Sequence, residues 1–194
     1  MDKADPNGET PLSDFVSQLN RYLALTGDHI LRYTSGTFGQ VAHKAIQDDI
    51  RWKYREHVVR TEVPISTGIV DLIVDTGIYE IKPVGGLVDP DNQLTRYLDS
   101  NELRRGFARG TIPFDDVVRS NSDPAFGPVN TLPWFVQLHY YLSGPGVILY
   151  EPSFDNKRLV RVLAAVTIAN LVRLALEADE AETEETGLDM ALAF

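Results

Sequence analysis

Residues 68–82 constrain the fold of this 194-residue chain more than any other stretch. Two runs rich in β-branched residues flank residues 75–77, Asp-Thr-Gly, and this pattern is typical of a tight β-hairpin. With Thr76 and Gly77 as the loop, alternation of side chains gives each strand two distinct faces. One face carries Val70, Leu72, Val74, Tyr79 and Ile81. The other carries three isoleucines and three charged residues, so we expect the hairpin to be buried on both sides.

The charged residues of the hairpin are Asp71, Glu80 and Lys82. The same pairing places Asp71 opposite Lys82, with Glu80 one diagonal step away. Burying these groups is costly unless they pair with one another or hold a metal. A salt-bridged trio at an exposed sheet edge is the structural alternative. An Asp followed by Glu-x-Lys on the next strand favours a Mg²⁺ site for phosphodiester chemistry, because Mg²⁺ prefers oxygen ligands and lysine can stabilise phosphate charge.

The length suits one domain with a sizeable core, and we expect this domain to cover residues 10–177. Residues 1–9 are expected to be disordered, and they lack the apolar stretch of a signal peptide. The absence of cysteine excludes disulfides, thiolate zinc sites and iron–sulfur clusters. These features predict a cytoplasmic protein, or one exported by another route.

The formal net charge of −10 argues at first against a nucleic-acid binder, because phosphate binding requires a positive surface. Seven acidic and no basic residues lie between Glu177 and Asp189, which leaves −3 on the rest of the chain. We therefore expect residues 178–194 to be a frayed acidic tail. Nine basic residues form two groups, which are either solvated surface or DNA contacts. These residues are Arg51, Lys53, Arg55 and Arg60, and then Arg96, Arg104, Arg105, Arg109 and Arg119.

Two helices are expected before the hairpin, over about residues 10–27 and 37–52. A capping box formed by Thr37 and Gln40 begins the second helix. This helix carries His43 on its inner side. A lone histidine on a helix is more often structural than a ligand, so the helix by itself does not assign a metal to His43.

The segments that flank the hairpin add further polar candidates. A strand over residues 58–63, ended by a proline, is expected to pair beside the hairpin, and it supplies Glu62 as a reserve carboxylate. After the hairpin a helix is expected to begin at Asp89. This helix presents Gln93 and Tyr97, four residues apart, on one face. An ordinary amphipathic helix with a half-buried tyrosine is the alternative.

The second half of the chain begins with residues 106–133, which are rich in Gly, Pro, Asn and Asp. They are too long for an ordinary connection, so we expect an irregular functional loop or an insertion, with Arg109 and Arg119 as DNA contacts. A second hairpin is expected from residues 135–142 and 147–151.

Residues 159–176 are apolar nearly all round, which predicts either a buried helix or a homodimer surface. A bilayer span needs about 20 apolar residues. Because Arg161, Asn170 and Arg173 interrupt the stretch, we do not expect it to contact a membrane.

Four motifs occur in the order Gly39-x-x-x-His43, Gly68-Ile-Val-Asp71, Glu80-Ile-Lys82 and Gln93-x-x-x-Tyr97. Their order resembles that of the PD-(D/E)XK nuclease superfamily and is most similar to RecB-type nuclease domains. Glu-Ile-Lys-Pro followed by Gln-Leu-x-x-Tyr also resembles nuclease domains of bacterial polymorphic toxins and secreted effectors. The resemblance covers residues 37–97. It implies an α/β (α+β) fold, a restriction-endonuclease-like mixed β-sheet flanked by helices with core order αβββαβ, which agrees with the order expected from the local patterns.

The resemblance also implies a metal site. Asp71 and Glu80 would ligate Mg²⁺ or Mn²⁺, with the Ile81 carbonyl as a third ligand. His43 would be an additional ligand in the RecB-type pattern.

The remaining matched residues would act on the water and the substrate. Lys82 would position or activate the water, and Gln93 and Tyr97 would orient that lysine or contact substrate. Two features depart from the family pattern: the Asp-to-Glu spacing is short, and Val70 replaces the proline that names the superfamily. Neither departure removes a ligand.

These observations predict a metal-dependent nuclease, with DNA as the expected polymer and RNA not excluded. One expected role is an antibacterial toxin effector, delivered into a target cell by a secretion system and paired with an immunity or inhibitor protein. A repair, recombination or phage nuclease is the second role. A catalytically silent nuclease fold used for binding or assembly is the alternative from a different class.

Overall fold

The structure, a computed structural model, describes residues 11–25, 32–120 and 132–191, with side chains as far as residue 177. Within these residues seven strands form one sheet in the order β1-β2-β3-β7-β6-β5, and a short β4 also pairs with β3. Strand β3 is parallel to β4 and β7, and the other neighbours are antiparallel. The strands are β1 (Val59–Ile65), β2 (Gly68–Val74), β3 (Gly77–Pro83), β4 (Ala108–Arg109), β5 (Asp115–Arg119), β6 (Val136–Gly144) and β7 (Val147–Phe154).

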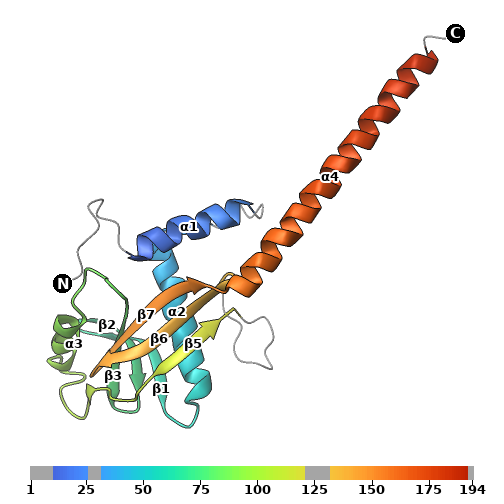
Figure 1. The fold of residues 1–194 in the computed structure, drawn as a ribbon. Helices are drawn as coiled ribbons and strands as arrows, with labels where there is room; N and C mark the ends of the chain where they lie inside the picture. Colours follow the sequence, from blue (N-terminus) through green and yellow to red (C-terminus); the bar gives the residue numbers. More distant parts are fainter. Residues whose placement is uncertain (1–10, 26–31, 121–131, 192–194) are drawn as a thin grey trace.

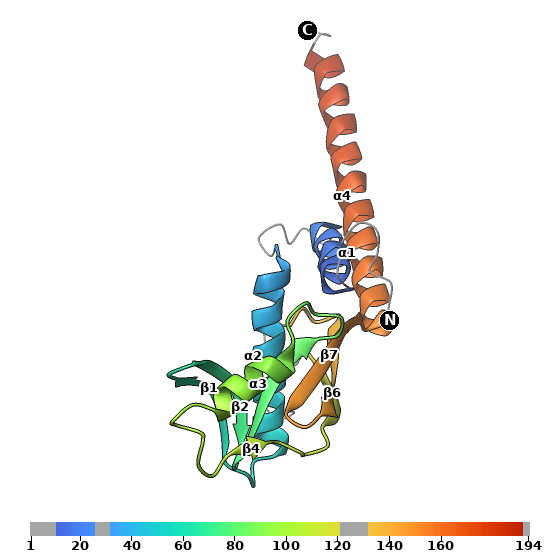
Figure 2. The ribbon, with the colours of Figure 1, turned by 90° about the vertical axis from the view of Figure 1, so that its left-hand side faces the viewer.

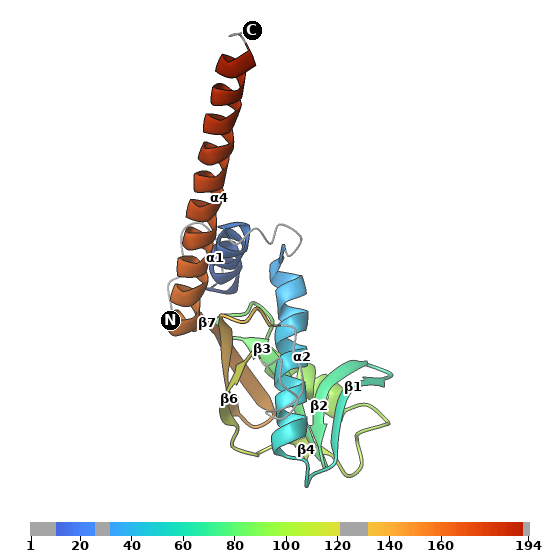
Figure 3. The same ribbon diagram turned by 90° about the vertical axis from the view of Figure 1, so that its right-hand side faces the viewer.

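Helices cover both faces of the sheet (Figures 1, 2 and 3). The larger core lies beneath α1 (Pro11–Leu25) and α2 (Ser35–Lys53), and the smaller core lies beneath α3 (Pro90–Leu98). The predicted α/β class, a mixed sheet flanked by helices, is confirmed. Elements follow the predicted order from α2 to α3, but β4, β5 and β6 precede the main parallel neighbour of β3, which is β7.

The central hairpin forms with its loop one residue earlier than predicted. The pairs are Leu72 with Tyr79, Ile73 with Ile78, and Val74 with Gly77. Asp75 takes a left-handed φ of 53° in the loop, and its carboxylate accepts the Val58 N–H at 3.0 Å. Asp71 therefore lies opposite Glu80, and not opposite Lys82 as predicted. Because the partner moves by two residues, the predicted faces of β3 are preserved.

Side-chain alternation is interrupted at Asp71. Val70 packs with Ile73 and Ile78 beneath α3. The sequence predicted it on the same face as Leu72 and Val74, which lies beneath α2. On the neighbouring strand Glu62 takes a left-handed φ of 51°, and the pairing of β1 with β2 skips Glu62 and Asp71. The prediction for Val70 was wrong because it assumed a regular strand.

Some element boundaries also differ from the prediction. Thr34, and not Thr37, is the N-cap of α2: the Thr34 hydroxyl accepts the Thr37 N–H at 3.1 Å, and the Thr37 hydroxyl accepts the Thr34 N–H at 2.8 Å. Strand β1 continues through Pro64, which an edge strand tolerates. The predicted start of α3 is confirmed, since the Asp89 carboxylate accepts the Asp91 N–H at 2.9 Å.

The stretch 106–133, predicted to be irregular, contains β4 and β5 and so extends the sheet. The second predicted hairpin is confirmed as β6 and β7. The predictions for residues 1–9, and those that fall on residues 26–31 and 121–131, lie outside the described residues.

Two arginines of this stretch, predicted to contact DNA, are bound within the protein. Arg109 pairs with the Asp91 carboxylate and donates to the Thr95 hydroxyl at 3.1 Å, which ties β4 to α3. Arg119 donates to the Gln137 side chain at 3.1 Å on the adjacent strand. Both contacts indicate structural roles.

The last helix, α4 (Asn156–Ala191), is 36 residues long and points away from the rest of the protein (Figure 1). It is not a buried helix: Leu159 and Val162 are buried against the core, but six large apolar side chains are more than half exposed. These are Val160, Ile168, Leu171, Val172, Leu174 and Leu176.

Two expectations for this region change. Residues 178–191, predicted to be a frayed tail, continue α4 to Ala191. By length and composition alone, Asn156–Glu177 is long and apolar enough to cross a membrane, which differs from the expectation based on its three polar interruptions. Only 11% of its most apolar window is buried.

Candidate active site

The candidate site lies at a fork in the sheet, where β2 and β3 separate. Pairing between these strands ends at Leu72 and Tyr79, while from Glu80 onward the opposite edge of β3 pairs with β7. Asp71 and Glu80 are the first residues beyond the fork. Because the strands diverge there, backbone groups that would pair in a continuous sheet need other partners.

The Asp71 carboxylate supplies one such partner. Its Oδ2 accepts the Ile81 N–H at 2.8 Å, a bond that spans the fork from β2 to β3. The same oxygen lies 3.7 Å from Nδ1 of His43 on α2. Asp71 is buried, so these contacts hold its side chain in a single direction.

Glu80 is a buried carboxylate with one oxygen paired and the other alone. Glu80 is 0% exposed, and its Oε1 accepts a hydrogen bond from Nζ of Lys82 at 2.5 Å. Its Oε2 has no hydrogen-bond partner. Burial, followed by the neighbouring Asp71 carboxylate, raises the pKa of Glu80 to about 7. A cation that prefers oxygen ligands would satisfy this atom and offset the repulsion between the two carboxylates.

His43 approaches the two carboxylates from α2. Burial lowers the pKa of its imidazole, against opposing effects from the Asp71 carboxylate and the Ile81 carbonyl. The lowered pKa favours the neutral ring at pH 7, which leaves one nitrogen lone pair for a proton or a metal. The Ile81 carbonyl, the predicted third ligand, lies on the same edge of β3 as the Ile81 N–H that Asp71 accepts, so it also faces the fork.

Gln47, one turn after His43, has a role that the sequence did not assign. Its Nε2 donates to the Asp71 carbonyl at 2.8 Å and to the Glu62 carboxylate at 2.5 Å. The side chain thus supports both strands where their pairing is interrupted. The sequence signal was the shared helical stripe with His43, but its partners depend on the irregular strands. Glu62, predicted as a reserve carboxylate, is engaged by this amide.

The predicted pair Gln93 and Tyr97 holds α3 against β2. The Tyr97 hydroxyl donates to the Ile69 carbonyl at 2.7 Å and accepts from Nε2 of Gln93 at 2.6 Å. Gly68 makes this approach possible, since a Cβ there would lie 3.1 Å from the tyrosine ring. These bonds give the pair an anchoring role beside the fork, and the predicted roles of orienting Lys82 or contacting substrate stay predictions.

Tyr150 on β7 is a site residue that the sequence analysis missed. It is 1% exposed, its ring meets the His43 ring edge-on at 6.0 Å, and its buried hydroxyl has no hydrogen-bond partner. Burial, with a smaller effect of Asp71, raises its pKa, so the hydroxyl keeps its proton at pH 7. No local pattern marks Tyr150, because it reaches the site through the pairing of β7 with β3.

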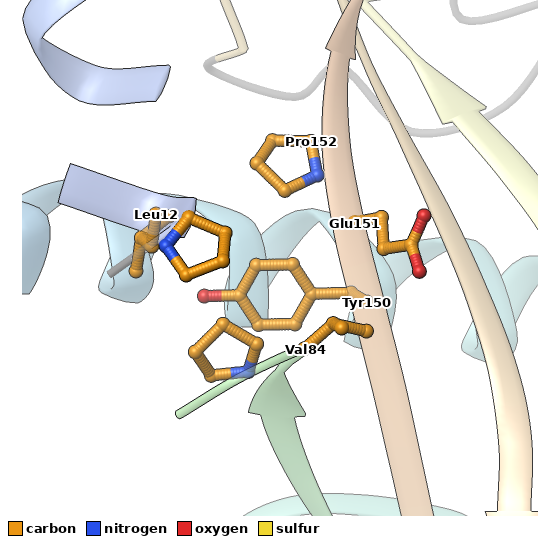
Figure 4. Close-up of a pocket in the computed structure, with 7 residues that line it drawn as sticks. Leu12, Val84, Tyr150, Glu151 and Pro152 are labelled. Carbon is orange, nitrogen blue, oxygen red and sulfur yellow. The ribbon is translucent and has the colours of Figure 1, made fainter. Parts of the chain in front are cut away.

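A hollow of about 180 Å³ lies beside Tyr150, between the start of α1, the end of β3 and the middle of β7 (Figure 4). It directly follows Lys82 along β3 and is largely apolar. Its other lining residues are Pro11, Leu12, Pro83, Val84, Glu151 and Pro152.

The donor set at the fork fits a divalent cation that prefers oxygen. No group of three or more His, Asp or Glu side chains is already gathered in the described part of the chain. Mg²⁺ requires only one or two carboxylates, because water and substrate oxygens fill its other positions. Asp71, Glu80 and the Ile81 carbonyl meet this requirement, and the unpartnered Oε2 of Glu80 is the observation that favours it.

Comparison of the chain with protein-family models, curated proteins and solved structures gave no match.

Proposed function

We propose that this protein is a metal-dependent nuclease that hydrolyses phosphodiester bonds, with DNA as its substrate. The observation that carries the proposal is the unpartnered, buried oxygen of Glu80, which lies beside the Asp71 carboxylate. An ammonium at the same point, that of Lys82, completes a set suited to phosphate chemistry. The resemblance of the motif order to PD-(D/E)XK nucleases supports the same class.

Asp71, Glu80 and the Ile81 carbonyl would hold Mg²⁺ or Mn²⁺, with His43 as an additional ligand. When bound, the cation supplies a water of lowered pKa and offsets negative charge on the phosphate. The protein prepares the carboxylates for this role, since Ile81 N–H orients Asp71 and Nζ of Lys82 orients Glu80. Preorganised donors of this kind need no rearrangement during the reaction.

Lys82 contributes through its position at the mouth of the fork. Its side chain is 18% exposed and reaches Glu80 from the solvent side of the buried pair. The ammonium can therefore donate to an attacking water or to a phosphate oxygen while it remains next to the carboxylate. Gln93 and Tyr97 act as positioning residues, since they hold α3 and the Ile69 end of β2 in place.

Two cellular roles are compatible with a nuclease of this kind. One is a toxin effector with an inhibitor protein, and the other is a repair, recombination or phage enzyme. Growth arrest on expression, relieved by a co-expressed inhibitor, distinguishes the toxin. A binding or assembly module is the second candidate function, favoured by the large apolar surface of α4.

The test is a nicking assay on supercoiled plasmid with Mg²⁺, Mn²⁺ or a chelator, run with thermal melting of the same samples. We expect metal-dependent nicking and a metal-dependent rise in melting temperature, because a ligand of the folded site stabilises it. Glu80→Ala should lose both effects. Lys82→Ala should reduce cleavage by roughly 100-fold or more and keep the thermal shift, because an ammonium does not ligate metal.

Lys82→Arg should not restore cleavage, because the guanidinium fork cannot replace a compact ammonium beside two carboxylates. Lys44→Ala is the matched control, since Lys44 lies exposed on α2 and pairs with Asp48. Near-normal cleavage by Lys82→Ala, or a melting curve unmoved by millimolar metal, would contradict the nuclease proposal. A metal-dependent shift without cleavage of DNA or RNA would favour the binding module.

A further inference from the structure

Helix α4 beyond the core has an apolar stripe on one side. At 100° per residue, Ala164, Ile168, Leu171 and Ala175 fall on the side opposite to the buried residues Leu159 and Val162. Val172 lies next to this stripe, and Leu174 and Leu176 lie between the stripe and the polar side of the helix. The polar residues Asn170, Arg173 and Glu177 instead fall on the side of Leu159 and Val162.

A lipid bilayer is a poor occupant for this surface, because the start of α4 is bound to the rest of the protein. Leu159 and Val162 belong to the larger core, and Arg158 donates to the Ser120 and Trp134 carbonyls, each at 3.1 Å. Beyond Val166, the last residue of α4 that packs against the core, the apolar part is residues 167–176, which is about ten residues or about 15 Å long. A bilayer core is about 30 Å thick, so this part would cross only half of it.

We propose that the stripe is the contact surface of a homodimer in which two α4 helices pack antiparallel. Charge along the helix determines the direction. Lys157, Arg158 and Arg161 lie near its start, and the seven acidic residues from Glu177 to Asp189 lie toward its end. A parallel pair would align like charges, whereas an antiparallel pair sets the basic start of each helix beside the acidic end of its partner.

The residue sizes agree with a two-fold axis between Ile168 and Leu171. In this register each Ile168 meets Leu171 of the second copy, and each Ala164 meets Ala175. Large residues pack at the centre, and alanines on either side allow close approach of the helices. The interface is isologous, so it closes as a dimer and does not propagate. It does not depend on the nuclease proposal.

The test is the mass of the full chain in solution, measured by sedimentation at several concentrations. We expect twice the chain mass of 21.7 kDa. Leu171→Glu should raise the dimer dissociation constant by roughly 100-fold or more, since it buries two unpaired charges near the axis. Asn170→Glu, one residue away on the opposite side, is the matched control and should remain dimeric. Both variants should keep the circular dichroism spectrum of the wild type, which shows that the fold itself is unchanged.

Single cysteines determine the direction, because the chain has none of its own. Under mild oxidation, a mixture of Ala164→Cys and Ala175→Cys chains should cross-link as heterodimers, and neither variant alone should cross-link efficiently. Efficient cross-linking of each variant with itself would overturn the antiparallel arrangement. A monomer at all concentrations would overturn the dimer, as would flotation of monomeric protein with phosphatidylcholine–phosphatidylglycerol vesicles.

Discussion

The fork and helix α4 depart from ordinary burial in opposite ways. At the fork a carboxylate that is 0% exposed lies beside a second carboxylate, and one of its oxygens has no partner. On α4, Ile168 and Leu171 are 62% and 61% exposed. Proteins usually bury apolar groups and pair the polar groups that they bury.

Each departure indicates a different kind of missing contact. The fork holds two carboxylates against one ammonium, and a cation that binds oxygen can supply the missing positive charge. Helix α4 lacks only apolar surface, which a second helix can supply. Proteins give up local stability at functional sites. Because the two regions lack different kinds of contact, they should respond differently to substitution.

The largest effect on stability should come from the part of α4 that is docked on the core. Leu159→Ala should destabilise the fold by about 2 to 4 kcal/mol, because it opens a cavity in the larger core. Urea unfolding at low protein concentration measures this change. Leu174→Ala, on the exposed part of the same helix, is the control. Equal losses for both variants would show that α4 does not differ along its length.

At the fork, Gln47→Leu should cost about 1 to 3 kcal/mol, because it leaves the Asp71 carbonyl and the Glu62 carboxylate without their donor. It should also reduce cleavage by displacing Asp71. Gln40→Leu, exposed on the same helix, should change neither property. A neutral result for Gln47→Leu would mean that the irregular strands do not depend on this amide.

Glu80→Gln should stabilise the protein in the presence of a chelator. The folded-state pKa of Glu80, about 7, lies above its usual value of 4.5, so the folded state binds more protons between these values. Wild-type stability should therefore fall as pH rises from about 4.5 to 7, and the variant should lack this slope. Above pH 7 the gain should be about 1 to 3 kcal/mol.

Thermal or urea unfolding across this pH range measures the difference between Glu80→Gln and wild type. Glu151→Gln, an exposed position on β7, provides the control and should track the wild type. A variant less stable than wild type at pH 8 would show that the Lys82 ion pair outweighs the burial of charge. Excess Mg²⁺ should reverse the order, because it stabilises only the wild type.

The smallest effect should come from the exposed ion pair of α4, in which Nη1 of Arg173 lies 3.3 Å from Glu177. Arg173→Ala should change stability by no more than about 0.5 kcal/mol, since exposed pairs at this spacing contribute little. Melting at low and high salt measures it. A loss above about 1 kcal/mol would indicate that this side of α4 also makes a contact.

The sequence by itself determined those features that depend on local chemistry. Alternation over residues 68–82 gave the hairpin, Asp89 and the following proline gave the start of α3, and the motif order placed Asp71, Glu80 and Lys82 in one constellation. A shift of two residues in the register left this constellation intact, because side chains in a strand repeat every second residue.

The tertiary structure alone decided how these residues meet. The fork exists because the pairing of β2 with β3 stops at Leu72 and Tyr79. On the opposite edge of β3, pairing with β7, a strand about 70 residues further along the chain, brings Tyr150 to the site. The same divergence and the irregular strand at Glu62 explain why Val70 was predicted on the wrong face and why the sequence assigned no role to Gln47. Whether the apolar stretch of α4 is covered depends on which surface lies next to it, and an amino-acid pattern does not encode that surface.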